Sequence, residues 1–203
     1  MKTLKKIALT LIILGLGATA IYAQDDLEQQ AKQRAQECVS QLNDCISFMA
    51  DKDKSLNDRK IYKKEAAKLF IANLGPYDVG GITKKTCYMQ TMSTYRKTVK
   101  TKPMLEYFDN VINLRYAKVD IESTDTYDIR VSELKLIDED EGLYQCTAYF
   151  DQAFKGYSKE GRPIYGDKTR KKVTCYVIMF DIDDSPVILV LLGDVKVDSI
   201  RKL

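Results

Sequence analysis

The sequence of 203 residues contains no histidine and no tryptophan. Without histidine, the chain cannot form a Ser-His or Cys-His nucleophile pair, use a histidine general base or bind a metal through imidazole. Its five cysteines include no C-x-x-C pair, which argues against a cysteine-ligated metal site. The sequence shows no catalytic signature, and we expect no cofactor. These absences narrow the chemistry but do not name a function.

The N-terminal segment, residues 1–23, has the pattern of a targeting signal. It begins with three lysines, continues with an apolar stretch and ends on a small residue at Ala23. This order is typical of a cleaved signal peptide. The alternative is a retained membrane anchor, because the apolar run would nearly span a bilayer if it extended to Ala23. We expect cleavage near Ala23, no membrane span afterwards, and an extracytoplasmic protein that is periplasmic or secreted.

Removal of this segment changes the charge balance. The full chain has 32 Lys and Arg against 29 Asp and Glu. Without the three lysines of the leader, 29 bases stand against 29 acids. Nonspecific nucleic-acid binding depends on excess positive charge, so we expect no nucleic-acid partner.

The first half of the remaining chain has helical patterns. Apolar residues recur at steps of three and four over residues 25–51, which predicts one long amphipathic helix. Ser55 and Asp58 form a capping-box-like start of a second helix, which Gly75-Pro76 ends. A third helix is predicted to begin near residues 101–103.

Strand patterns follow, with one strand predicted earlier at residues 86–95. From Tyr116 onward the apolar period changes to two, which predicts strands at residues 116–123, 127–137, 143–155, 169–181 and 187–199. A change of parity in the second of these predicts a β-bulge near Ser132-Glu133. Short turns favour an antiparallel meander. We therefore expect residues 24–203 to form a single α+β domain, with N-terminal helices packed on a curved, cone-like antiparallel sheet.

This order of elements resembles the nuclear transport factor 2-like superfamily, also called the cystatin-like cone. The resemblance covers nearly the whole mature chain and rests on the order of elements, with no motif that matches residue by residue. It implies a cone that holds either an enzyme pocket or a binding site, or a non-catalytic dimer. The fold alone does not decide between these functions.

The cysteines divide by position. Cys38 and Cys45 lie about 10 Å apart along one predicted helix and cannot join each other. Cys146 and Cys175 flank a predicted hairpin with a turn near residues 159–161. A two-residue loop would pair Cys146 with Cys175 and allow a cross-strand disulfide, whereas a three-residue loop would pair Cys146 with residue 174. Cys87 has no assigned role.

Charged residues gather at the two ends of the predicted meander. Acidic turns near residues 138–141 and 181–184 share one end, because alternate turns of a meander fall together. Such oxygen-rich clusters either hold a cation such as Ca²⁺ or are solvated rims. The candidate metal ligands are Asp138, Asp140, Asp181, Asp183 and Asp184. Residues 155–172 make the opposite end basic, either to orient a charged partner or to discourage edge aggregation.

The last predicted hairpin is apolar on both faces. Residues 173–180 and 187–192 show almost no alternation, which indicates strands buried on both sides. Helices can cover one face, so the other face packs either on a second copy or a protein partner, or on the wrapped ends of its own chain.

Aromatic residues at core-facing positions of the predicted elements suggest a ligand pocket or simply a filled core. The candidates are Tyr88, Tyr107, Tyr144, Phe150 and Tyr176.

We expect an extracytoplasmic, dimeric, non-catalytic binding or protein-interaction module rather than an enzyme. One alternative is a small-molecule pocket enzyme of the isomerase or dehydratase kind, which can work with Asp and Tyr alone. Asp151 and Tyr149 are poorly placed for that role, because they project from the face opposite Phe150. Another alternative is an envelope-associated protein that binds Ca²⁺ at the acidic turns.

Overall fold

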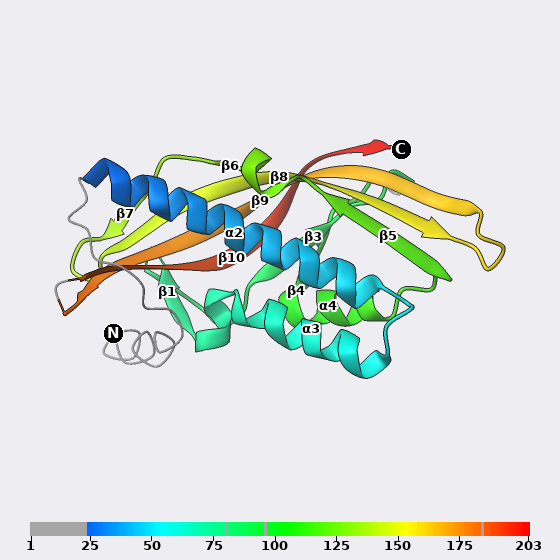
Figure 1. The fold of residues 1–203 in the computed structure, drawn as a ribbon, viewed down its shortest axis with the longest axis horizontal. Helices are drawn as coiled ribbons and strands as arrows, with labels where there is room; N and C mark the ends of the chain where they lie inside the picture. The colour runs from blue at the N-terminus through cyan, green and yellow to red at the C-terminus, as the bar shows by residue number, and fades with distance from the viewer. Residues whose placement is uncertain (1–23, 80, 96, 184) are drawn as a thin grey trace.

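A long helix lies against one face of a strongly curved sheet in the computed structural model (Figure 1). The structure describes residues 24–79, 81–95, 97–183 and 185–203. The predicted signal peptide, residues 1–23, lies outside the described residues. In the part of the chain that is described, no helix is both long and apolar enough to cross a membrane.

The predicted helices are present. They are α2 (Gln24–Ala50), α3 (Leu56–Lys68) and α4 (Met104–Ile112), with short 3-10 helices η2 (Ile71–Leu74) and η3 (Thr126–Asp128). The apolar stripe of α2 is fully buried at Ala31, Ala35, Val39, Leu42 and Met49. Ser55 caps α3, because its hydroxyl oxygen accepts a hydrogen bond from the Asp58 backbone N–H at 3.1 Å.

The main sheet has eight strands. Six follow the spatial order β4-β3-β10-β9-β8-β5, and β6 and β7 also pair with β8. The bounds are β3 (Tyr88–Thr91), β4 (Lys100–Pro103), β5 (Lys118–Ser123), β6 (Arg130–Val131), β7 (Lys135–Asp138), β8 (Leu143–Tyr157), β9 (Pro163–Ile182) and β10 (Ser185–Lys202). The β8–β9–β10 meander is antiparallel as predicted, but β10 pairs with β3 in parallel. The sheet is therefore mixed rather than purely antiparallel.

The segments predicted as two separate meander strands before β8 form a single interrupted edge. Strands β5, β6 and β7 all pair with β8, one after another along its length. The parity change near residues 132–133 marks a complete break between β6 and β7, where a bulge was expected. The interruption lets the edge follow the curvature of the long strand.

The β8–β9 hairpin has the register that pairs Cys146 with Cys175. The loop is longer than both the two-residue and the three-residue alternatives, since the Ser158 N–H donates to the Arg162 carbonyl at 2.9 Å. A register shift between Gly156 and Tyr157 absorbs the extra residues. Because directly opposed residues point to the same face, this register decides which side chains enter the cone.

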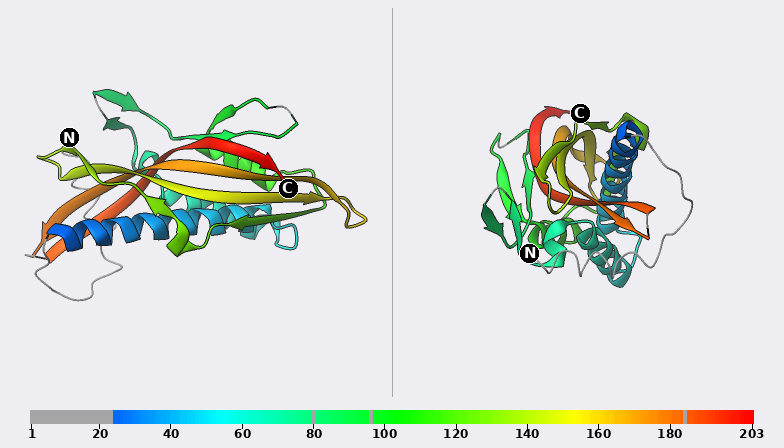
Figure 2. Two further views of the ribbon diagram at one scale, coloured as in Figure 1. Left: turned by 90° about the horizontal axis from the view of Figure 1, so that it is seen from above. Right: turned by 90° about the vertical axis from the view of Figure 1, so that its left-hand side faces the viewer.

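The chain covers part of the second face of its own last hairpin. A small hairpin of β1 (Tyr77–Val79) and β2 (Ile82–Lys84), which the sequence did not predict, lies on the side of the long strands away from α2 (Figure 2). Tyr77 packs against Tyr176 of β9, with ring centroids 6.0 Å apart. A homodimer or partner contact at this hairpin stays a prediction.

The described architecture is the predicted α+β cone. Helices α2 and α4 cover the concave face of the curved sheet, and the aliphatic core lies between them and strands β8 to β10. This arrangement confirms the α+β class and the N-terminal helices packed on a curved sheet that the order of elements predicted.

Candidate functional site

A cluster of polar side chains lies inside the cone, where the alternation of β8 and β9 directs them. On β9, Asp167, Thr169 and Lys171 share the parity of the core residues Val173 and Cys175. They are 5%, 6% and 5% exposed. These positions face the helices, although they belong to the basic segment that the sequence suggested as a solvated hairpin end.

A hydrogen-bonded relay connects β9 to helix α2. Lys171 Nζ donates to Gln152 Oε1 at 2.7 Å, and Gln152 Nε2 donates to Asn43 Oδ1 at 3.1 Å. An ammonium group can only donate, so it fixes the orientation of both amides. The relay therefore ends in a surplus donor, Asn43 Nδ2, which is buried without a partner among the described residues.

Lys171 is an amine in an environment that disfavours its charge. No carboxylate of the described residues lies within ion-pair distance of its Nζ, which instead lies 5.8 Å from the centroid of the Tyr107 ring. Burial lowers the pKa of Lys171 to about 8, against the opposing effect of the charge on Asp167. A lysine of this kind can exchange a proton near neutral pH.

Asp167 forms the second ionisable centre of the cluster. Burial raises the pKa of its carboxyl group, although a hydrogen bond donated by the Tyr165 hydroxyl opposes this effect. The Tyr165 oxygen also lies 3.1 Å from the Ser93 hydroxyl. Packing against Tyr116 and Phe154 holds the Tyr165 ring in place, with centroids 6.3 and 5.8 Å away. The carboxyl group is thus positioned as a proton donor or acceptor.

These groups are concentrated in one place. Every buried polar or charged residue among those described belongs to this cluster: Asn43, Gln152, Asp167, Thr169 and Lys171. Burying a charge without an opposite partner costs several kcal/mol in stability, so a purely structural core would favour apolar residues here. Ionisable groups whose pKa values are displaced toward neutrality are typical of acid–base sites.

Two clefts adjoin the sheet. The smaller, with a volume of about 190 Å³, lies beside Asn43 between α2 and the β5–η3 segment. The larger, about 490 Å³, lies on the convex side and is lined by charged residues including Arg130, Asp151, Arg170 and Asp198. Its Arg170 donates to Asp151 at 3.1 Å. Asp151 thus lies away from the cone interior, as the parity of β8 predicted.

The structure separates the predicted pocket aromatics. Tyr107 and Phe150 are buried near Lys171, since Phe150 is its cross-strand partner. Tyr88 is 43% exposed on β3, and Tyr176 packs on Tyr77 at the other face. Tyr144 lies toward the far end of β8, opposite Val177. Tyr144 shares the face of Phe150 but lies six residues along β8 from it, whereas Tyr176 lies on the opposite face. A ligand pocket among the five stays a prediction.

The acidic turns do meet at one end of the sheet. Gly142 accepts a hydrogen bond from the Met179 backbone N–H at 2.9 Å, which places the turn before β8 beside the end of β9. Asp184 lies outside the described residues. Among the remainder, no group of three or more Asp, Glu or Cys side chains is arranged to hold a metal ion. A cation site at Asp138, Asp140, Asp181 and Asp183 stays a prediction.

The cysteines are buried or partly buried thiols. Cys146 and Cys175 face each other across β8 and β9, and both are free in this structure. Their mutual hydrogen bond raises the pKa of the Cys175 thiol, with burial adding to the effect. Cys38 and Cys45 lie on the inner side of α2, where burial raises the pKa of each thiol to about 11. A disulfide between Cys146 and Cys175 stays a prediction.

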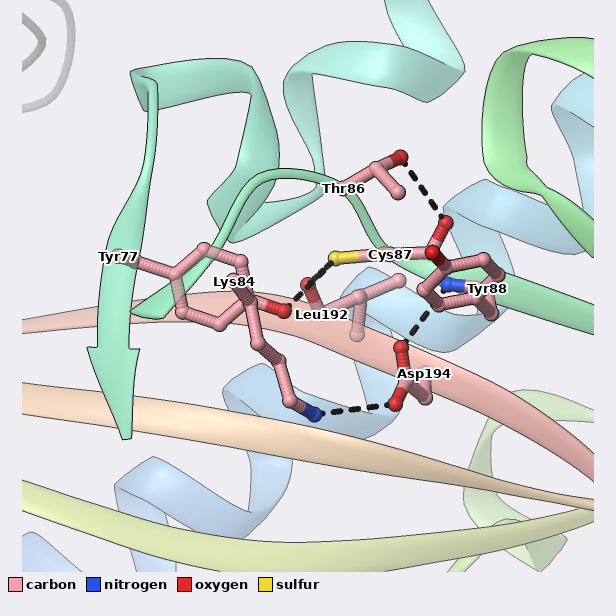
Figure 3. A network of polar contacts seen from close by, with 7 residues as sticks. All are labelled: Tyr77, Lys84, Thr86, Cys87, Tyr88, Leu192 and Asp194. Carbon is pink, nitrogen blue, oxygen red and sulfur yellow. Dashed lines mark hydrogen bonds and ion pairs between the residues drawn. The ribbon is translucent and has the colours of Figure 1, made fainter. Parts of the chain in front are cut away.

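A second polar network contains Cys87 and explains its place (Figure 3). Its thiol lies 3.5 Å from the Tyr77 hydroxyl and, as the figure shows, points toward the Leu192 carbonyl of β10. Close by, Asp194 accepts from the Tyr88 backbone N–H at 2.9 Å and pairs with Lys84 at 3.2 Å. This charge is paired and partly exposed, so the network fastens β2 and β3 to β10.

The sequence interpretation missed Asp167, Lys171, Gln152 and Asn43 as site residues. The signal that could have found them is parity. Positions 167, 169 and 171 continue the odd-numbered core positions of β9, and position 152 continues the even-numbered core positions of β8. The density of lysine and arginine in residues 155–172 obscured this pattern.

Comparisons with known proteins are confined to distant structural likenesses. No family model and no curated protein matches the chain. One similar solved structure is a "Putative Scytalone Dehydratase" from Novosphingobium aromaticivorans, with 8% identity, a TM-score of 0.40, and coverage of 86% of this chain and 91% of the other. Another is the hexachlorocyclohexane dehydrochlorinase LinA type 2, with 12% identity, a TM-score of 0.36, and coverage of 86% and 93%.

A third is LinA type 3 from Novosphingobium barchaimii, also at 12% identity and a TM-score of 0.36, covering 86% of this chain and 94% of the other. The chain itself buries a carboxyl group at Asp167 and an amine at Lys171 inside the cone. The expectation of a non-catalytic binding or interaction module is therefore corrected. The chain is an α+β cone with ionisable groups inside it.

Proposed function

We propose that this chain is an enzyme that performs general acid–base chemistry, an isomerisation or an elimination such as dehydration, on a small molecule in the cone. The observation that carries the proposal is Lys171, a buried amine that no described carboxylate pairs with. Asp167, with its raised pKa and its Tyr165 partner, supplies a second proton-transfer group in the same cluster.

The two groups suit opposite ends of one substrate. Their Cα atoms are about 13 Å apart at roughly 3.3 Å per strand residue. The Lys171 side chain reaches back to Gln152, the cross-strand partner of Thr169, which brings its amine closer to Asp167. The Tyr107 ring lies 5.8 Å from the Lys171 amine.

The proposed reaction begins with the neutral form of Lys171. Its amine takes a proton from a carbon next to a carbonyl group, and the electron pair of that C–H bond forms an enolate. In an isomerisation, the carboxyl group of Asp167 returns a proton to another carbon. In a dehydration, the enolate forms a double bond as the neighbouring C–O bond breaks, and Asp167 protonates the leaving hydroxyl group, which departs as water.

Proton exchange with simple carbonyl probes tests this proposal. The purified protein is incubated in D₂O with small carbonyl and hydroxycarbonyl compounds, and NMR follows deuterium incorporation, isomerisation or loss of water. Lys171→Met should abolish the exchange that the wild type catalyses. Lys168→Met, a neighbouring lysine on the opposite face, is the matched control and should retain it. Exchange that survives in folded Lys171→Met would refute the role of Lys171.

The proposed place of work is outside the cytoplasm. Support comes from the sequence pattern of residues 1–23, with its basic start, apolar stretch and small residue at Ala23. Intact-mass measurement of the protein isolated from the cell envelope or medium should give a chain that begins near residue 24. A chain that retains residues 1–23 would favour the membrane-anchor alternative.

A further inference from the structure

We infer that the cleft between α2 and the β5–η3 segment is a binding site for a neutral, hydroxyl-rich small molecule, of about the size of a monosaccharide. This inference goes beyond the proposed acid–base chemistry, and binding can be measured without turnover. It rests on the buried, unpartnered amide of Asn43 and on the composition of the cleft that Asn43 lines.

Asn43 presents a hydrogen-bond donor that the described part of the protein does not satisfy. Its residue is 3% exposed, and its Oδ1 is occupied by Gln152 Nε2 at 3.1 Å. Because Lys171 fixes the orientation of the relay, Nδ2 is the group left over. A buried donor without an acceptor costs about 1–3 kcal/mol, which an acceptor oxygen of a bound ligand would recover.

The lining of the cleft is almost entirely polar. Apart from Asn43, it consists of hydroxyl and carboxylate residues and a single aliphatic residue: Ser40, Asp44, Ser47, Ile121, Ser123, Thr124, Asp125 and Thr126. Hydroxyl groups donate and accept, and carboxylates accept, so the cleft offers both kinds of partner that a sugar or polyol hydroxyl requires.

The charges on the lining exclude other ligand classes. No Lys or Arg of the described residues lines the cleft, and Asp44 and Asp125 are acidic, so an anion would be repelled. Among the described residues, no group of three or more Cys, Asp or Glu side chains is arranged to hold a metal ion. A neutral ligand that both donates and accepts hydrogen bonds fits this combination.

The walls of the cleft are fixed by contacts between its two sides. Thr126 Oγ1 donates to Ser40 Oγ at 2.8 Å, which joins η3 to α2. Thr124 Oγ1 accepts from the Asp151 backbone N–H at 2.8 Å, which holds the chain after β5 against β8. A volume of about 190 Å³ is smaller than the several hundred Å³ typical of drug-sized sites, and therefore suits a compact ligand.

Binding of simple probes tests the inference. Glucose, myo-inositol and glycerol are titrated into the full protein, and NMR follows the amide resonances of the cleft residues. We expect saturable shifts confined to the cleft. Gluconate, an acidic analogue of glucose, should bind at least about tenfold more weakly because of the acidic lining. Gluconate binding as tight as glucose binding would overturn the neutral-ligand assignment, and no saturable shift with any neutral probe would overturn the site.

Variants assign the binding to Asn43. Asn43→Asp keeps the acceptor for Gln152 and removes the amide donor, so we expect binding at least about tenfold weaker. Asn110→Asp, at an exposed position of α4, is the matched control and should bind as the wild type does. If Asn43→Asp fails to fold, Ser123→Val replaces a hydroxyl of the β5 wall with a methyl group and should also weaken binding. Undiminished binding in the folded variant would contradict the inference. Asp167 lies outside the relay, so Asp167→Asn should lose proton exchange and still bind glucose, which separates failure of this site from failure of the proposed acid–base chemistry.

Discussion

Basic residues on the two faces of strand β9 lie in opposite environments. On the convex face, Lys168 and Arg170 both pair with Asp151, each at 3.1 Å. On the concave face, Lys171 is buried and has a neutral amide, Gln152, as its hydrogen-bond acceptor. Adjacent residues of similar chemistry therefore differ in whether their charge is compensated.

This difference separates stabilising groups from reactive ones. Although burial acts against it, hydrogen bonds from Lys168 and Arg170 lower the pKa of Asp151, so that its charge is retained at neutral pH. Inside the cone, burial moves the pKa of Lys171 downward and that of Asp167 upward. Ion pairing holds the charged form of a group such as Asp151 at neutral pH. Burial instead moves the pKa values of Lys171 and Asp167 toward neutral pH, where these groups can exchange protons.

The largest expected effect on the rate of proton exchange comes from removing the amine of Lys171, on the concave face of β9. Lys171→Met should reduce catalysed proton exchange by about 100-fold to 10,000-fold, the usual contribution of a general base. The same substitution at Lys168 on the convex face should change the rate less than about threefold, since only an exposed ion pair is lost. Initial rates of deuterium incorporation measure both. Equal losses of exchange rate in the two variants would contradict a catalytic role that is specific to Lys171.

Asp167 provides the next test. Asp167→Asn keeps the shape of the side chain and removes its acidic carboxyl proton, and we expect a rate loss of about 100-fold. Tyr165→Phe removes the hydroxyl that donates to Asp167 and should lower the rate less, by about tenfold. The pH profile discriminates between chemical and structural roles, because Tyr165→Phe should shift its acidic limb upward. If the acidic limb of the pH–rate profile of Tyr165→Phe coincides with that of the wild type, the assignment of Asp167 as the acid is contradicted.

The pH dependence of stability gives a test that needs no substrate. The pKa of Lys171 is about 8 in the folded protein and 10.5 for an ordinary lysine. Below pH 8 the folded state carries the full cost of the buried charge, and this cost disappears as pH rises to 10.5 because both states become neutral. Lys171→Met should therefore be more stable relative to the wild type at pH 8 than at pH 10.5, by about 3 kcal/mol. Urea unfolding at both pH values measures this difference, and a constant difference would be inconsistent with a buried ammonium.

The smallest effect is expected for a substitution on the convex face, where ion pairs are partly exposed, and it concerns the free energy of unfolding. Asp151→Asn removes the partner of Lys168 and Arg170, which are partly solvated. We expect a loss of at most about 1 kcal/mol in the free energy of unfolding, screened further by salt. Urea unfolding in low and high salt checks this. A much larger loss would mean that the convex pairs hold the sheet together more than exposed charges can.

Much of the fold was predictable because local patterns dictate it. The stripe of α2 and the cap at Ser55 are signals within a few residues of one another. Strands β8, β9 and β10 carry enough alternating or apolar residues to be recognised as a meander. The pairing of β5, β6 and β7 along one strand, and the parallel contact of β10 with β3, depend on long-range packing that no local pattern encodes.

The site was harder to predict than the fold. The burial of Lys171 depends on the register of the β8–β9 hairpin, which a five-residue loop and a register shift determine together. The contact between Gln152 and Asn43 spans 109 residues of sequence. Interpreting residues 155–172 by charge alone suggested a solvated end, whereas alternation places Asp167, Thr169 and Lys171 inside the cone.

Measurement of the Lys171 pKa by NMR tests the central claim most directly. The side-chain resonances of labelled lysine are followed from pH 6 to 11, and the signal missing from the Lys171→Met spectrum identifies Lys171. A midpoint near pH 8, well below the other lysines, is the predicted result. A midpoint near 10.5, together with those of the exposed lysines, would contradict the account, because the concave face would then hold an ordinary solvated amine.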